Sequence, residues 1–273
     1  INVNSNFNSE INFNEQVTKK YTKFLKQYTF AKGLKKLKAD LNNNFSIEFD
    51  DTYKVKDYNY SISGKLQKSK FEFSSPIKSV FVTEEIKNIY FSDLEMKTIF
   101  KPNTIKISSE GKYSFDNLNF LNINLENNFN NGILNLKLDL DYKKNIEIDF
   151  INYKKPEGSV ANIFLILEKK KNNFTIKKLS FKEENNSFKV EGLSFNNNKL
   201  LSFKKVEVIT AKNDFKIEKG KKIKIKGTKF DATNLAKVFT KRNKENRFEK
   251  IDSDIEIDFK NINVPMSERL QNF

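Results

Sequence analysis

Apolar and polar side chains alternate with a period of two over long stretches of this sequence. Between Ile1 and Phe13 every even position is Asn or Glu, while the odd positions carry apolar or small side chains. Similar alternation recurs in residues 134–140 and 146–150. Because successive side chains of a strand point to opposite faces, each such segment has one apolar face and one polar face. The pattern predicts a long antiparallel sheet whose apolar face must be covered by something.

The composition suits a thin sheet better than a thick core. Mean hydropathy is -0.65 and only 37% of residues are hydrophobic, yet 27 residues are Phe. A chain of 273 residues can form one large all-β domain or two smaller ones. We expect an all-β protein in which residues 1–273 form one continuous groove-like segment of a larger protein. A softer subdivision into residues 1–103 and 104–273 is an alternative.

Two residue types that many enzyme active sites use are missing from the sequence. It contains no Cys and no His, which excludes disulfides, thiolate zinc sites and histidine-activated nucleophiles. Carboxylate pairs such as Asp139/Asp141 are spaced by two on the polar side of a strand, where both face solvent. No glycine-rich phosphate loop or calcium loop is present. We therefore expect no enzymatic activity, no metal and no cofactor.

The formal charge of +15 suggests an anionic partner. However, Arg, whose planar fork suits phosphate and guanine, occurs only at Arg242, Arg247 and Arg269. Acidic residues are also interspersed with the lysines. We interpret the charge as a solvated face and expect no nucleic acid as partner, with anionic lipid headgroups as the second interpretation.

Asn supplies most of the expected turns, because Gly and Pro are scarce and Asn tolerates the left-handed region. From residue 130 onward the turn signals recur at the spacing of long hairpins. The candidate turns are Asn42–Asn44, Asn130–Gly132, Lys143–Asn145, Pro156–Gly158, Asn172–Asn173, Asn185–Asn186, Asn196–Asn198 and Lys212–Asn213.

Two or three helices are expected to interrupt the sheet. Apolar residues in 14–32 recur at helical spacing, and a second helix should start at Asp231, whose carboxylate can cap it. A third, short helical turn should run from Pro265 to Leu270. The apolar run Ile163–Leu167 breaks the alternation, which predicts a strand covered on both faces, one of them by a helix.

One short motif resembles a known family. In residues 224–235 a strand ends in Gly and is followed by two variable residues, a bulky residue, Asp and an expected helix. This order resembles the signature of AsmA-like proteins of the YhdP type, relatives of TamB; its residues here are Gly227, Phe230, Asp231 and Leu235. Residues 58–66, 188–195, 201–209 and 255–259 are similar to the strands that accompany the signature.

The resemblance implies a bridge-type lipid carrier in the periplasm, anchored in the inner membrane by a helix outside this segment. Its expected partners are phospholipid acyl chains, and possible further partners are inner- and outer-membrane proteins. A curved, U-shaped sheet would hold the acyl chains on its apolar side. Exposing two chains of about 16 carbons to water costs on the order of 25 kcal/mol, which an apolar groove would largely remove without any catalytic residue.

The predicted lipid-binding residues share the apolar side of the expected strands. Each could equally be an ordinary core residue of a β-sandwich, and Asp231 is better explained as a helix cap than as a ligand. Two other interpretations stay open: a structural β-sandwich or adhesin-like module of the envelope, and a module that binds a partner by strand addition. The predicted residues are Leu134, Leu136, Leu138, Leu140, Ile146, Ile148, Phe150, Phe174, Ile176, Phe188, Val190, Val206, Val208, Ile223 and Ile225.

Overall fold

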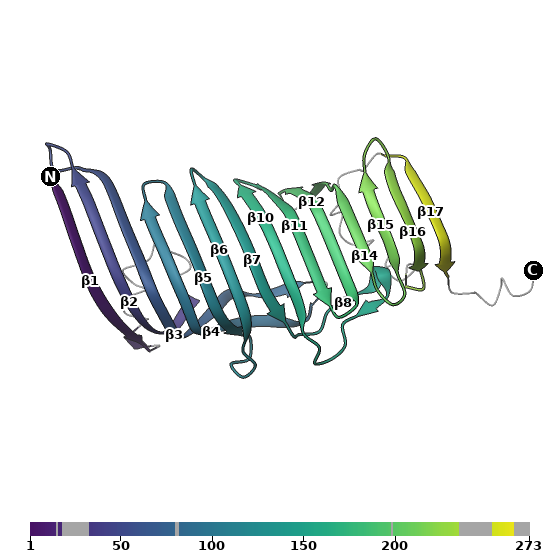
Figure 1. Ribbon diagram of the computed structural model, residues 1–273, viewed down its shortest axis with the longest axis horizontal. Helices are drawn as coiled ribbons and strands as arrows, with labels where there is room; N and C mark the ends of the chain where they lie inside the picture. Colours follow the sequence, from purple (N-terminus) through teal and green to yellow (C-terminus); the bar gives the residue numbers. More distant parts are fainter. Residues whose placement is uncertain (15, 18–32, 80–81, 198, 235–252, 265–273) are drawn as a thin grey trace, which may run out of the picture. The chain divides into compact units, whose positions relative to one another are not determined.

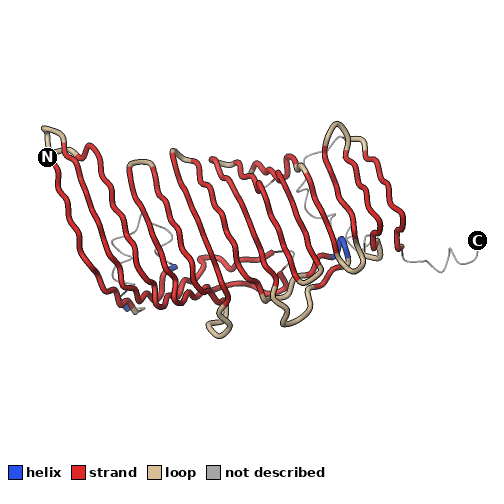
Figure 2. Tube along the Cα trace, viewed as in Figure 1, coloured by secondary structure: helices blue, strands red, loops and turns tan. Residues whose placement is uncertain are grey.

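The computed structural model describes residues 1–14, 16–17, 33–79, 82–197, 199–234 and 253–264. Strands make up 76% of the described residues, and no helix among those residues reaches a length of seven, which confirms the all-β prediction (Figure 2). Within the described residues, a 3-10 helix, η2, spans Asp149–Ile151. The strands are β1 (Asn2–Phe13), β2 (Leu34–Phe49), β3 (Val55–Ser79), β4 (Val82–Lys101), β5 (Thr104–Ser114), β6 (Leu121–Asn130), β7 (Ile133–Tyr142), β8 (Glu147–Ile148), β9 (Tyr153–Lys154), β10 (Ala161–Lys170), β11 (Asn173–Glu183), β12 (Asn186–Asn196), β13 (Lys199–Ser202), β14 (Lys205–Ile209), β15 (Asp214–Lys219), β16 (Ile223–Asp231) and β17 (Ile255–Asn263).

Fifteen of these strands belong to one open, mostly antiparallel sheet. The chain divides into two compact units. Unit 1, residues 1–79 and 84–141, contains β1 to β7 in sequence order (Figure 1). Unit 2, residues 80–83 and 142–273, contains β10-β11-β12-β14-β15-β16-β17, with β13 also paired to β12 and the β8–β9 hairpin separate. The expected subdivision at residues 103/104 falls within unit 1, between β4 and β5.

Most neighbouring strands pair as antiparallel hairpins, as the spacing of the turn signals predicts. Asn131 and Gly132 both have positive φ in the β6–β7 turn, and Asn197 has positive φ after β12. One predicted turn is wrong: Asn42–Asn44 lies inside β2, where Asn43 pairs with Phe7 of β1. The last pair, β16 with β17, is parallel rather than antiparallel.

The three expected helices lie largely outside the described residues. At the start of the first, the Asn14 side chain accepts a hydrogen bond from the Val17 amide (3.0 Å), the contact of an N-terminal cap. At the second, Asp231, which ends β16, accepts a hydrogen bond from the Thr233 amide (3.1 Å), and the helix expected to follow lies in residues that are not described. Residues 265–270 are not described.

Two glycines, Gly111 and Gly227, lie where a neighbouring strand approaches too closely for a side chain. A Cβ on Gly111 would lie 2.6 Å from the Asp93 carbonyl oxygen of β4, beside the register shift that follows Ser92. A Cβ on Gly227 would lie 2.4 Å from the Asp214 carbonyl oxygen, again beside a register shift. Such bulges sharpen the local twist of a strand pair, and glycine admits the close approach.

Replacing Gly227 by Ala should destabilise the protein by about 1–3 kcal/mol, because the new methyl group would force β15 and β16 apart. The matched control is Gly220→Ala, since the nearest atom to a Cβ there is 3.9 Å away. The control should change stability by less than about 0.5 kcal/mol. Urea unfolding measures both. Equal unfolding midpoints for the two variants would contradict the assigned close approach.

Candidate functional site: the apolar faces of the two units

A row of large apolar side chains crosses unit 1 from strand to strand. Phe45 pairs with Tyr60, whose ring stacks on Phe100 at 6.0 Å between centroids. The row continues through the paired residues Ile105, Phe129 and Leu134 of β5, β6 and β7. All six side chains are only partly buried. We call this set, Phe45, Tyr60, Phe100, Ile105, Phe129 and Leu134, the apolar row.

A closed cluster lies on the same face near the other end of these strands. Leu94, Tyr113 and Ile123 are buried there, and Leu138 and Leu140 pack against them. The Tyr113 hydroxyl donates to the Asp141 carbonyl at 2.5 Å, which fixes the ring across β6. Leu138 and Leu140 therefore contribute to an ordinary core, which is the alternative that the sequence left open for each predicted residue.

Leu134 and Leu136 lie outside this cluster. Leu134 belongs to the apolar row, and Leu136 pairs with Asn127 in the next row of the same face. Both are half-buried. At the β1 edge of this face, Val3 and Phe7 are 45% and 49% exposed. Among the described residues, the part of the unit 1 face outside the closed cluster thus runs through Leu134, Leu136 and the apolar row.

Polar groups that the sequence analysis did not anticipate are set into this face. Asn43, 3% exposed, donates to the Ser9 hydroxyl (2.9 Å) and accepts from the Tyr60 hydroxyl (2.7 Å). Thr98, Ile107, Asn127 and Leu136 pair in sequence across β4 to β7. Asn127 Oδ1 is buried and accepts no hydrogen bond from the described residues. The face is therefore hydrocarbon interrupted by small buried polar groups rather than a uniform wall.

In unit 2, the predicted residues of β11 to β16 share one face, although the apolar residues change from even to odd sequence positions along β11. The β10–β11 register shifts between Ile166 and Leu167, so Lys177 is extra on β11, and Gly192 beside it on β12 has φ of 65°. This double irregularity brings Phe174 and Ile176 to the face of Leu179 and Phe181. On the other face, the Lys178 ammonium lies 5.4 Å from the Phe164 ring centroid. Within the described residues, the Lys178 ammonium thus covers Phe164 on the face where the sequence predicted a helix.

Two rows cross the unit 2 face. The first consists of Phe181, Phe188, Val208 and Phe215, of which three are less than 10% exposed. The second consists of Leu179, Val190, Val206, Ile217 and Ile225, all half-buried, and ends at Ile257 of β17, which is 62% exposed. Ile223, two residues before Ile225 on the same face of β16, is buried.

The first row is covered by the protein itself. Residues 146–155, which we call the cover segment, contain the β8–β9 hairpin and η2. The Tyr153 ring lies 6.0 Å from Phe181 and 4.8 Å from Phe188, and Phe150 lies 5.8 Å from Phe230. The prediction of a strand through Ile146, Ile148 and Phe150 is therefore wrong: Ile146 precedes β8, Ile148 ends it and Phe150 lies in η2.

Buried polar contacts hold the cover segment on the family-like motif. The Asn152 amide donates to Asp231 Oδ2 (2.8 Å) and the Asn213 amide donates to the Ile151 carbonyl (2.7 Å). Asp231 is 3% exposed and also lies 3.6 Å from the Lys212 ammonium. Gly227 admits the close approach of β15, and Phe230 packs on the cover segment; Leu235 is not described. The motif residues that are described thus act in packing and anchoring.

A second anchor lies at Tyr153, the residue that follows Asn152 in the cover segment. Glu183, which is fully buried, accepts hydrogen bonds from the Tyr153 hydroxyl (3.2 Å) and the Asn186 amide (2.7 Å). Burial raises the pKa of the Tyr153 phenol, and the Glu183 carboxylate adds to that effect. The buried Lys155 ammonium donates to the Ser159 carbonyl at 2.6 Å. Burial lowers the pKa of Lys155, while the negative charge of Glu183 opposes that shift.

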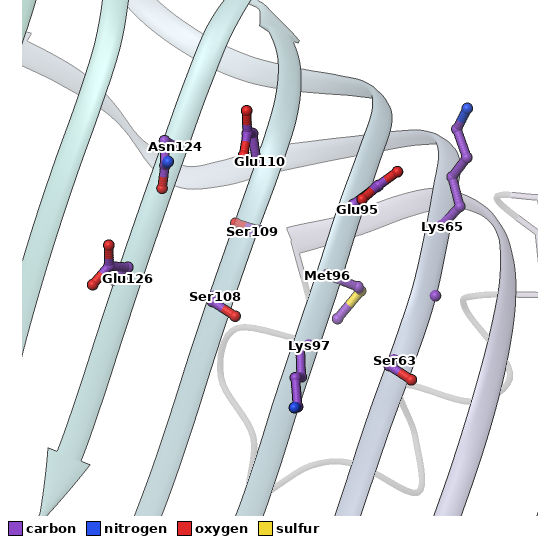
Figure 3. A pocket seen from close by; sticks show the side chains of 11 residues that line it. Ser63, Lys65, Glu95, Met96, Lys97, Ser108, Ser109, Glu110, Asn124 and Glu126 are labelled. Carbon is purple, nitrogen blue, oxygen red and sulfur yellow. The ribbon is translucent and has the colours of Figure 1, made fainter.

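The polar face of unit 1 carries an open hollow of about 630 Å³ (Figure 3). Its wall includes Lys65, Glu95, Lys97, Glu110 and Glu126, from β3, β4, β5 and β6. Lys65 of this wall pairs with Asp93 at 2.9 Å, and Glu126 of the wall pairs with Lys137 at 2.7 Å. Exposed pairs of this kind contribute little to stability. The mixed charges favour a hydrated surface over a site for one kind of ion.

The anchor at Asp231 predicts a dependence of stability on pH. Burial alone would raise the pKa of its carboxyl, but hydrogen bonds from Thr233 and Asn152 outweigh burial and hold the pKa below its ordinary value of 3.8. Because the pKa of Asp231 is lower in the folded state than its ordinary value of 3.8, the ionised carboxylate stabilises the folded protein above pH 3.8. This stabilisation is lost as the pH falls through the pKa of the folded state.

Asp231→Asn should therefore destabilise the protein at pH 7 by about 1–3 kcal/mol and reduce the loss of stability between pH 4 and pH 2. The control is Glu157→Gln, an exposed carboxylate of the same unit. Urea unfolding at several pH values gives the comparison. A wild-type pH profile that Asp231→Asn leaves unchanged would contradict the assigned anchor.

Within the described residues, no helix is long and apolar enough to cross a membrane, and no three acidic side chains gather as a metal site would require. No family model, curated protein or solved structure matches this chain.

Proposed function

We propose that the apolar face binds hydrocarbon chains of lipids, and that the chain is a non-catalytic segment of a phospholipid carrier. The observation that carries the proposal is the apolar row, a set of large half-buried side chains aligned across successive strands. A row that runs across strands offers a long, narrow hydrocarbon contact. An extended acyl chain has that shape.

The energetics of such binding favour many weak contacts over one fixed position. Each methylene removed from water contributes about 0.8 kcal/mol. The apolar row offers side-chain hydrocarbon and aromatic rings, so a bound chain could shift along it with little change in energy. Small buried polar groups such as Asn43 and Thr98 lie beside the row and are largely shielded from solvent. The proposed role is therefore carriage rather than tight storage of one ligand.

In unit 2, the second row is the corresponding surface. Val190, Val206 and Ile225 are half-buried there, while the cover segment occupies the first row. The proposed lipid contact in this unit accordingly excludes Phe188 and Val208. Phe174 and Ile176 continue the accessible side beyond the bulge at Lys177, where Phe174 stacks on Phe195 at 4.5 Å.

The resemblance to AsmA-like proteins extends the proposal to the cell envelope. On that basis the protein would act in the periplasm as part of an inner-membrane-anchored carrier that moves phospholipid between inner and outer membranes. Membrane proteins at both ends would be its partners, and nucleic acid would not. Cross-strand ion pairs support a hydrated polar face: Lys177 with Glu168 (2.6 Å), and Lys222 and Lys226 with Glu256.

A second candidate is a structural envelope module whose apolar faces are packed by its own chain. The cover segment favours this function for unit 2, because it closes the first row with aromatic contacts and buried hydrogen bonds. The two functions differ in one measurable property. A carrier binds acyl chains on the accessible rows, and a self-packed module does not.

Titration with a fluorescent phospholipid tests the proposal. Leu136→Asp places a charge on the accessible part of the unit 1 face and should weaken lipid binding at least tenfold, because the carboxylate would lose water on contact with hydrocarbon. Asn135→Asp is the matched control, because Asn135 is the neighbour of Leu136 on β7 and points to the polar face. This variant should bind the phospholipid as the wild type does. Far-UV circular dichroism checks that both variants fold.

Equal affinity of Leu136→Asp and Asn135→Asp for the phospholipid would contradict binding on this face. Absence of saturable binding by the folded wild-type protein would reject carriage and leave the structural module. If Leu136→Asp fails to fold, Leu136→Gln provides the same comparison with a neutral polar group against Asn135→Gln.

A further inference from the structure

One end of the unit 2 strands is rich in lysine and free of acidic residues. The turns after β10, β12 and β15 and the segment before β14 lie at this end (Figure 1). Backbone hydrogen bonds join them: the Asn197 amide donates to the Asn172 carbonyl, and the Lys219 amide donates to the Lys204 carbonyl. Residues 169–173, 196–205 and 219–222 contain many lysines but no Asp or Glu. Positive charge is therefore concentrated along one edge of the unit.

Most of these lysines are exposed, and the fold does not neutralise them. We call Lys169–Lys171, Lys199, Lys204, Lys219 and Lys221 the lysine end; Lys219 is half-buried and the others are exposed. Over the described ranges of unit 2, no carboxylate forms an ion pair with any of them. Lys222 is left out of the set because it pairs with Glu256.

The lysines on the polar face of the same unit are arranged differently. One row across β11 to β17 alternates strictly in charge. Its residues, in register, are Lys178, Glu191, Lys205, Glu218, Lys224 and Glu256. In the next row Lys189 lies opposite Glu207, with their charged groups 3.8 Å apart. The polar face thus balances its own charge.

At the lysine end, by contrast, two like charges lie opposite each other. Lys205 pairs with Glu218, so the residues next to them, Lys204 and Lys219, face each other across β14 and β15. Like charges directly opposite destabilise a sheet. An anion bound at this end would relieve that repulsion.

The other end of the same strands carries acidic side chains. Glu183 and Glu184 follow β11, Asp214 begins β15 and Asp231 ends β16. Lys212, which lies at that end, pairs with Asp231 at 3.6 Å. The surplus of positive charge therefore belongs to one end of unit 2 and not to the whole unit.

Apolar side chains lie among the lysines of this end. Lys169 pairs with Phe174, whose ring stacks on Phe195 at 4.5 Å between centroids. Leu201, between Lys199 and Lys204 in the sequence, is 40% exposed. Lysine beside exposed hydrocarbon suits the interface of a membrane, because the ammonium reaches the phosphates while apolar groups enter the acyl boundary.

We propose that the lysine end of unit 2 docks on the surface of a membrane that contains anionic phospholipids. Lysine fits this partner because its flexible ammonium attracts phosphate as a point charge, and several lysines near an anionic bilayer add their attractions. No Arg, the residue that reads nucleic acid by its planar fork, occurs among the described residues. The proposal concerns a bilayer surface and does not rest on the carriage of acyl chains.

Co-sedimentation with vesicles tests the docking. Vesicles of phosphatidylcholine with about 30% phosphatidylglycerol should bind the wild type about tenfold more tightly than pure phosphatidylcholine, and salt at about 0.5 M should abolish the difference. Replacing three exposed lysines of this end by Gln (Lys171→Gln, Lys199→Gln and Lys221→Gln) should weaken binding to the anionic vesicles about tenfold or more.

The matched control removes the same charge from the polar face of unit 2. Lys182→Gln, Lys189→Gln and Lys216→Gln replace three lysines that are also exposed. Because salt screens charges that lie far from the membrane, this variant should bind the anionic vesicles within about twofold of the wild type. Far-UV circular dichroism checks that both triple variants fold.

A single tryptophan gives a local reading, since the chain has none. Leu201→Trp should shift its fluorescence to shorter wavelength when the anionic vesicles are added, because the indole would enter the membrane interface. Val160→Trp is the control: residue 160 is 47% exposed and directly precedes β10, at the opposite end of that strand from the lysines. Its fluorescence should not shift.

Equal binding of the wild type to neutral and anionic vesicles would overturn the proposal, and so would equal losses in the two triple variants. A shift at Val160→Trp without one at Leu201→Trp would place the contact elsewhere and overturn it too. Binding to a DNA duplex that the lysine-end variant weakens, without binding to anionic vesicles, would assign these lysines to nucleic acid instead. Uptake of a fluorescent phospholipid from neutral vesicles reports carriage separately, so failure of the docking is distinguishable from failure of the proposed carrier function.

Discussion

The backbone hydrogen-bond ladder between neighbouring strands determines both faces of the sheet. It fixes the register of each pair, and the register decides which side chains lie beside one another on a face. In unit 1 the registers carry one apolar residue of each strand into line from Phe45 to Leu134. The same ladder sets the ion-paired lysines on the opposite side. Both surfaces of the protein follow from one set of pairings.

Irregularities in the ladder preserve the apolar face rather than disrupt it. At Lys177 and Gly192 the sequence changes from even to odd apolar positions, and the bulge compensates for that change. Gly111 and Gly227 likewise accommodate close approach of a bulged neighbour. A one-residue error at any of these points would turn apolar side chains to the polar side. Register, rather than burial alone, therefore selects the residues of the face.

The alternation predicted the fold class, most hairpins and the shared face of residues 134–140, because these depend on local periodicity. It failed where the outcome depends on distant contacts. Residues 146–150 have the same pattern, yet they belong to the cover segment. Hydrogen bonds among Asn152, Asp231, Asn213 and the Ile151 carbonyl hold that segment on the apolar face of unit 2. Asn42–Asn44 resembles a turn, but Asn43 is buried by partners on β1 and β3. The hollow on the polar face has no signal in the sequence, since it arises between four strands.

We propose that the accessible rows of the apolar face are occupied by hydrocarbon from lipids. Native mass spectrometry of the purified protein, released gently from solution, measures this without any variant. We expect masses above that of the polypeptide by the mass of one or more phospholipids, with lipid recovered on extraction. A folded protein that carries no lipid after exposure to phospholipid vesicles would rule out lipid carriage on this face.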